Sequence, residues 1–139
     1  MLAFFVFFTN NVRAANDDFS LSVWVKPSTA IASKAIVAKA EELRSATDAA
    51  GKPTCQIKTT TWQTAVVSAQ AIALNEWAHI ACVYDLVNLK IFVNGVETGS
   101  TALTAVPDDT ANVLLGKDAS AGTSYGIFSG LIDSLLGII

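Results

Sequence analysis

Acidic residues are the first candidates for chemistry in this sequence, and six of the twelve form three adjacent pairs: Asp17–Asp18, Glu41–Glu42 and Asp108–Asp109. Hydrolysis of a glycosidic bond needs two carboxylates about 5–5.5 Å apart for retention, or farther apart for inversion. Adjacent residues on a strand point to opposite faces, so none of these pairs supplies that arrangement. Cross-strand pairing of the second pair with Glu76 or Glu97 is the weaker alternative, a minimal glycoside hydrolase. The sequence also has no G-x-S-x-G nucleophile motif. We therefore predict that the protein is not an enzyme.

Aromatic and polar side chains offer a binding site instead. The candidate ligand-binding residues are Trp24, Trp62, His79, Lys90 and Phe92. A sugar ring can stack on an exposed aromatic ring while polar neighbours fix its orientation. Packing across neighbouring strands is the alternative explanation for Trp24 and Phe92, and a hydrogen bond to a neighbour is the alternative for His79. A site on the loop rim is equally open, and it would use Asp108, Asp109, Asp118 or Tyr125.

The chain has two cysteines, Cys55 and Cys82. Cys55 shares strand parity with Ile57, and Cys82 shares it with Ile80, so we expect both side chains to point into the core. Buried free thiols are the preferred interpretation. A disulfide is the alternative, and it would indicate an oxidising compartment. Zinc is not supported, because His79 and Cys82 point to opposite faces of one strand.

The segment that must position these residues most directly is Trp77–Gly95, which has two apolar runs of period two. The alternating apolar residues are Ile80, Cys82, Tyr84, Leu89, Ile91 and Val93. Period two indicates strands with one buried face. Asp85–Asn88 separates the runs as a short turn, and Asn94-Gly95 is a strong hairpin signal. We therefore predict an antiparallel meander in a chain that is mainly β.

Three segments together resemble the laminin-G-like, concanavalin A-like domains. In the central segment, Trp77–Gly95, the resemblance rests on W-x-H, Tyr-Asp and the final V-N-G. The segment Phe19–Pro27 (FSLSVWVKP) is similar to the family's early core strand. The segment Gly130–Asp133 (GLID) is similar to the start of its last strand. The order of the segments agrees over roughly residues 18 to 133. The resemblance implies an all-β, two-sheet antiparallel jelly roll. It implies one domain over residues 1–139 that lacks the family's usual terminal extensions.

The same resemblance implies a function outside cells. Domains of this kind mostly bind glycans or surface proteins, so we predict a non-catalytic, lectin-like recognition module that is extracellular or on a particle surface. Family members often hold a structural calcium ion, for which the resemblance points to Asp133 as a ligand. The family's acidic partner precedes its first core strand, but this chain has no acidic residue before Asp17. The alternative is that Asp133 bonds backbone amides at a strand bend.

Residues 34–50 carry conflicting signals. They are rich in Ala, Glu, Lys and Leu, and Gly51 follows where a helix C-cap would be, which favours a helix. The resemblance instead implies a strand at Ala35–Ala40 and a hairpin from Glu42–Thr47 to Thr54–Thr59. Because tertiary context often overrides propensity, we predict the sheet.

Both ends of the chain are apolar on both strand faces, over Leu2–Phe8 and Leu135–Ile139. We interpret these segments as strands that need cover on both sides. The alternative function is therefore a structural or oligomerisation domain, a homo-oligomer that assembles through its terminal strands. A secretion signal cleaved near Val12–Ala14 is less favoured, because no Lys or Arg precedes the apolar run.

Bulk composition narrows the partners further. The net charge of −3 and the pI of about 4.9 leave no basic surface for nucleic acid. The longest apolar run, Met1–Phe8, is far shorter than the roughly 20 residues of a spanning helix, so we expect no membrane insertion. A content of 52% hydrophobic and 15% charged residues is typical of a chain with a packed core.

Overall fold

The computed structural model describes residues 17–40, 42–103 and 112–137, and this part of the chain forms strands and no helix. The strands are β1 (Phe19–Pro27), β2 (Lys34–Lys39), β3 (Leu43–Thr47), β4 (Pro53–Ile57), β5 (Val66–Val67), β6 (Ala78–Tyr84), β7 (Asn88–Val93), β8 (Val96–Ala102), β9 (Val113–Leu115), β10 (Gly126–Ile127) and β11 (Gly130–Gly137).

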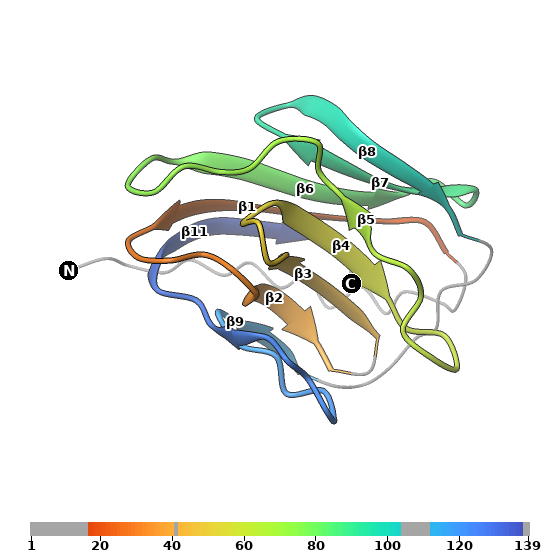
Figure 1. Ribbon diagram of the computed structural model, residues 1–139. Coiled ribbons are helices and arrows are strands. Elements are labelled where there is room, and N and C mark those ends of the chain that lie inside the picture. The colour runs from red at the N-terminus through yellow and green to blue at the C-terminus, as the bar shows by residue number, and fades with distance from the viewer. Residues whose placement is uncertain (1–16, 41, 104–111, 138–139) are drawn as a thin grey trace.

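These strands form two sheets that pack face to face (Figure 1). One sheet has the order β11-β1-β6-β7-β8, and the other has the order β10-β2-β3-β4-β5, with β9 also paired to β2. The pairings are antiparallel except for the short parallel contact between β10 and β2. The prediction of an all-β, two-sheet jelly-roll sandwich is confirmed.

The core lies between the sheets and follows the alternation of the sequence. In β6 and β7 every second side chain is buried, as the central segment predicts, including Ile80, Ile91 and Val93. Burying an aliphatic side chain of this size contributes about 1.5–3 kcal/mol. Asn94 and Gly95 both have positive φ, 51° and 82°, which is the two-residue turn that matches the twist of the flanking strands. The predicted meander is confirmed.

A disulfide between Cys55 and Cys82 joins the two sheets through the core, from β4 to β6, with the Cα atoms 6.0 Å apart. Both residues are buried, as their parity predicts. The preferred interpretation of free thiols is wrong. Parity places both side chains between the sheets, but it does not say which positions of two stacked sheets face each other. That register decides whether the thiols meet.

Within residues 34–50, β2 and β3 are strands, and the described residues of this segment form no helix, although propensity favours one. β2 and β3 are almost entirely buried, and β3 pairs along its length with β4. Gly51, which sits where a helix C-cap would, has φ 75° and closes the turn between β3 and β4. In that turn the side chain of Asp48 accepts hydrogen bonds from the amides of Ala50 and Lys52 at 2.8 and 2.9 Å. Pairing and burial on both faces outweigh the intrinsic helix preference here.

Several predictions fall outside the described residues. They are the strand at Leu2–Phe8, the cleavage site at Val12–Ala14, the pair Asp108–Asp109, Glu41, and the last two residues of the chain. In β11, Leu135 is buried, whereas Leu136 is 57% exposed. Assembly through the terminal strands stays a prediction.

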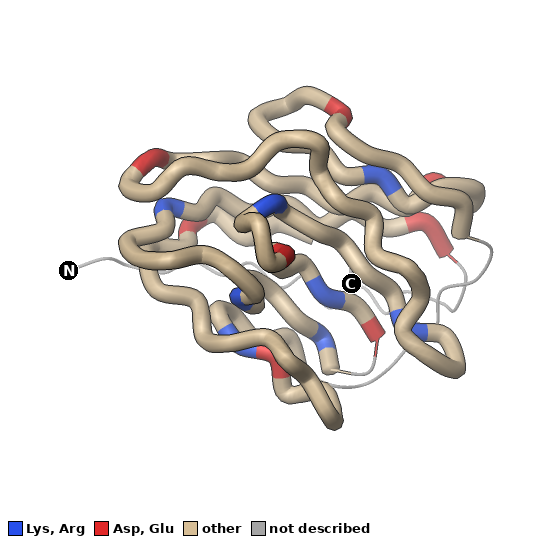
Figure 2. Tube along the Cα trace, viewed as in Figure 1, with Lys and Arg blue, Asp and Glu red and all other residues tan. Residues whose placement is uncertain are grey.

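Charged residues of both signs are interspersed over the two sheets, and neither sign dominates the face seen in Figure 2. Within the described ranges, no helix is long and apolar enough to cross a membrane.

Candidate ligand-binding surface

The outer face of β3 and β4 carries a polar pair in register, Arg44 opposite Gln56. Their neighbours Leu43 and Ile57 point into the core, so the alternation of the two strands turns Arg44 and Gln56 outward. The Nε and Nη2 atoms of Arg44 donate to the Gln56 Oε1 atom at 2.8 and 2.6 Å. The Gln56 Nε2 atom in turn donates to the carbonyl oxygen of Gln63 at 2.5 Å, which holds the following loop against the sheet.

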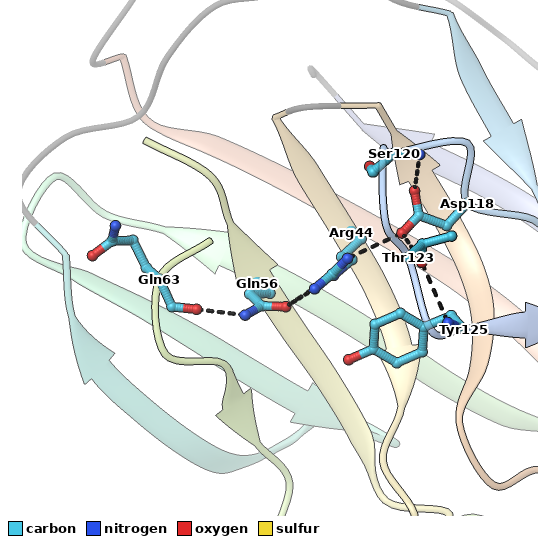
Figure 3. Close-up of polar contacts among 7 residues, drawn as sticks. All are labelled: Arg44, Gln56, Gln63, Asp118, Ser120, Thr123 and Tyr125. Carbon is cyan, nitrogen blue, oxygen red and sulfur yellow. Dashed lines mark hydrogen bonds and ion pairs between the residues drawn. The ribbon is translucent and has the colours of Figure 1, made fainter. Parts of the chain in front are cut away.

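Asp118 lies on the other side of Arg44 from Gln56, so that Arg44 is between the two residues, as Figure 3 shows. The Arg44 Nη1 atom lies 3.1 Å from the Asp118 Oδ2 atom, and the Asp118 side chain is fully buried. The loop that carries Asp118 is tied to β2 where the amide of Gly116 donates to the carbonyl of Ile36 at 2.7 Å.

Local hydrogen bonds fix the charge state of Asp118. The amide of Ser120 donates to the Oδ1 atom at 2.8 Å, and the hydroxyl of Thr123 donates to the Oδ2 atom at 2.9 Å. Burial alone would raise the pKa of Asp118. The hydrogen bonds from Ser120, Thr123 and Arg44 outweigh it and hold the pKa below its ordinary value. Asp118 is therefore an anion at neutral pH.

Two aromatic rings lie against the guanidinium. The Arg44 Cζ atom is 3.8 Å from the centre of the Trp62 ring and 4.6 Å from the centre of the Tyr125 ring. Both rings are only partly buried. Cation–π contacts contribute about 0.5–2 kcal/mol each, so Arg44 orders both rings on the outer face. We call Arg44, Gln56, Trp62, Asp118 and Tyr125 the Arg44 surface.

Chemically, the Arg44 surface offers two ordered, partly open aromatic rings beside amide and hydroxyl groups. The rings can stack against the flat face of a sugar ring, and the polar groups can form hydrogen bonds with its hydroxyl groups.

Four of the five predicted ligand-binding residues lie on the other sheet, and so does Asp133. Trp24 on β1 pairs in register with His79 on β6, and their rings are 5.1 Å apart. Trp24 is 41% exposed on this outer face. Asp133 on β11 is the register partner of Trp24 on its other side. The structure therefore brings Trp24, His79 and Asp133 together on the sheet opposite to the one that carries the Arg44 surface with Trp62.

Lys90 and Phe92 share that outer face on β7 but belong to other rows of the sheet. Lys90 forms an ion pair with Asp85 at 2.7 Å. The hydrogen bond from Lys90, followed by those from the amides of Asn88 and Val87, lowers the pKa of Asp85 to about 2. Phe92 pairs with Ala81 and is partly buried. The ion pair of Lys90 with Asp85 therefore stabilises the turn between β6 and β7.

The side chain of Asp133 is hydrogen-bonded to the backbone, as the alternative to calcium binding predicts. The Asp133 Oδ1 atom accepts a hydrogen bond from the amide of Ser134 at 2.7 Å, and Ser134 has φ 51°, which is the bonding expected at a strand bend. Calcium takes six to eight oxygen ligands, usually including several carboxylates. Within the described ranges, no three His, Cys, Asp or Glu residues gather into a group that could hold a metal. Calcium binding at Asp133 therefore stays a prediction without support from these residues.

Sequence reasoning missed Arg44 and Gln56. Both lie at outward positions of strands, and Arg44 lies in the segment with the conflicting helix signal. The loop-rim alternative did include Asp118 and Tyr125, and Trp62 was a candidate. The sequence does not show how these three loop residues come to lie beside Arg44.

Comparison with known proteins gives one family. A model of the concanavalin A-like lectin/glucanases superfamily matches residues 6–136. No curated protein is significantly similar in sequence to this chain.

Three solved structures illustrate the structural similarity. Domain 4 of a GH43 extracellular arabinanase from Geobacillus stearothermophilus, in complex with arabinotriose, is 24% identical, with TM-score 0.67, over 91% of this chain and 62% of that chain. A putative carbohydrate-binding protein from Bacteroides ovatus is 13% identical, with TM-score 0.72, over 91% of this chain and 38% of that chain. The Ruminococcus gnavus IT-sialidase CBM40, bound to α2,3-sialyllactose, is 17% identical, with TM-score 0.71, over 86% and 74%. The chain thus spans less than two thirds of the first two structures, and the similarity to all three is one of fold.

Proposed function

The chain belongs to the concanavalin A-like lectin/glucanases superfamily, and from this premise we propose that it is a non-catalytic carbohydrate-recognition module that binds through the Arg44 surface. The observation that carries the proposal is that Arg44 orders Trp62 and Tyr125 as two partly open rings on one sheet face. Structures of similar fold contain arabinotriose or sialyllactose, which supports a glycan as the ligand class.

The state of the buried carboxylates supports binding without catalysis. A glycosidase acid needs a raised pKa so that it still carries a proton near neutral pH. The pKa of Asp118 is lowered instead, and its carboxylate is paired with Arg44. The other buried carboxylate among the described residues, Glu42, pairs with Lys39 at 2.7 Å. Both carboxylates are ion-paired, and Asp118 is not in the state that an acid catalyst requires.

The other sheet offers an alternative binding face through Trp24, His79, Lys90 and Phe92. The observation in its favour is that Trp24 is 41% exposed beside the imidazole of His79. The two faces make different predictions for tryptophan variants, since Trp62 belongs to one face and Trp24 to the other.

A structural or oligomerisation role is the second candidate function. Leu131 and Leu136 on β11 are 41% and 57% exposed, and β11 ends its sheet among the described strands. Exposed apolar side chains on an edge strand favour pairing with a second chain, here a homo-oligomer, or docking on a surface protein. Sedimentation velocity tests this role, because a strict monomer at high protein concentration contradicts it.

We propose that the protein acts outside the reducing cytosol, in an extracellular or particle-surface setting. The disulfide between Cys55 and Cys82 supports this, because such bonds persist in oxidising compartments.

Affinity electrophoresis in gels that contain polysaccharides tests the proposed function. The wild-type protein should be retarded by at least one polysaccharide, and Trp62→Ala should abolish the retardation. Trp77→Ala is the matched control, because Trp77 is an exposed tryptophan directly before β6, a strand of the other sheet. Retardation lost in Trp24→Ala but kept in Trp62→Ala would move the site to the other face. No retardation by any polysaccharide would contradict glycan binding.

A further inference from the structure

Three of the N–H groups of Arg44 are already used within the protein. A free guanidinium recognises a carboxylate through two parallel N–H groups. Here Nε and Nη2 both donate to the Gln56 side-chain oxygen, and Nη1 donates to Asp118. All three guanidinium nitrogens therefore have acceptors before any ligand arrives.

The charge of Arg44 is also balanced. The Asp118 carboxylate lies 3.1 Å from the guanidinium, and the side chains of Arg44 and Asp118 are 10% and 0% exposed. At this burial the pair is poorly screened by water, so a ligand carboxylate that approaches Arg44 meets the negative charge of Asp118 as well. The faces of Trp62 and Tyr125 are negative too, because aromatic rings carry a quadrupole. Lys58, the residue directly after β4, makes an interaction of its own.

We infer that the Arg44 surface selects uncharged sugars, neutral pentose or hexose units, over sugars that carry a carboxylate such as sialic or uronic acids. This inference rests on the proposed function of the same surface. A neutral sugar stacks on Trp62 or Tyr125 without losing the hydration of a charge. A carboxylated sugar loses the hydration of its charge, and Arg44 is already compensated by Asp118.

The first test compares matched ligands by isothermal titration calorimetry. Arabinotriose and lactose are the neutral probes, and trigalacturonic acid and α2,3-sialyllactose are the acidic ones. We expect at least one neutral probe to bind about tenfold or more tightly than either acidic probe, a difference of about 1.4 kcal/mol. We also expect its affinity to change little between about 50 mM and about 500 mM salt, because no net charge is paired.

Tighter binding of an acidic probe, weakened by salt, would overturn the inference while leaving glycan binding intact. Absence of binding to all four probes and to a wider panel would overturn the proposed function and the inference with it. The two failures are therefore distinguishable.

The second test removes the compensating charge with Asp118→Asn, which leaves Arg44 uncompensated. The preference should shift toward the acidic probes by about tenfold or more and should become salt-dependent. Glu97→Gln is the matched control, because it makes the same charge change at an exposed position on β8 and should leave the preference unchanged. A folded Asp118→Asn protein with wild-type preference would contradict the role of charge balance. If this variant does not fold, the wild-type comparison of neutral and acidic probes still decides the inference.

Discussion

Reduction of the disulfide between Cys55 and Cys82 should cause a large and measurable loss of stability. The bond closes a loop across 27 positions and joins β4 to β6 through the core. A loop of that length removes about 12 cal/mol/K of chain entropy from the unfolded state, or about 3.5 kcal/mol at 25 °C. That is a substantial part of the 5–15 kcal/mol that typically stabilises a domain.

Urea denaturation with and without a reductant throughout measures this loss. The free energy of unfolding should fall by about 3.5 kcal/mol on reduction, and the midpoint by about 2 M at a typical urea slope. The double variant Cys55→Ala/Cys82→Ala is the control, since reductant should not change its midpoint. Titration of thiols in the denatured, unreduced protein should find none. Two free thiols, or a loss below about 0.5 kcal/mol, would refute the reasoning.

Three further predictions follow from the two outer faces. Arg44→Met leaves the buried Asp118 carboxylate without its cation and should lower the free energy of unfolding, measured with urea, by about 3 kcal/mol. The double variant Arg44→Met/Asp118→Asn should lower it clearly less. Equal losses in the two variants would contradict the pairing. Because the folded-state pKa of Asp118 is below its ordinary 3.8, its stabilisation is complete above that value and is lost as pH falls through the folded-state pKa. Asp118→Asn should therefore flatten the Tm profile below about pH 4, and an unchanged acid limb would count against the assignment. Calcium at about 5 mM, compared with a chelator, should shift Tm by less than about 1 °C, and a rise of several degrees would revive the site at Asp133.

Strand pattern and family resemblance predict the fold well because alternation is a local property. Each residue of β6 and β7 takes its face from the chain itself, and the Asn94-Gly95 turn takes its geometry from two residues. Residues 34–50 are different, since their local preference is helical and only pairing with β4 decides for the sheet.

The disulfide and the Arg44 surface were harder to predict because both depend on contacts between distant segments. Cys55 and Cys82 were correctly placed in the core, but their meeting depends on how two sheets stack. Asp118 reaches Arg44 across 74 positions, a distance over which strand parity carries no information. Trp24 is a contrasting case, because it was a candidate exposed ring and is 41% exposed, and the strand register sets His79 beside it.

The most direct test of the central claim uses the three tryptophans of the chain as reporters. In a two-dimensional NMR titration with a neutral oligosaccharide that binds, the indole N–H signal of Trp62 should shift progressively and saturate. The signals of Trp24, on β1 of the opposite sheet, and of Trp77, directly before β6 of that sheet, should stay in place. Movement of Trp24 with Trp62 unchanged, or no movement in any of the three with every neutral sugar tried, would contradict recognition at the Arg44 surface.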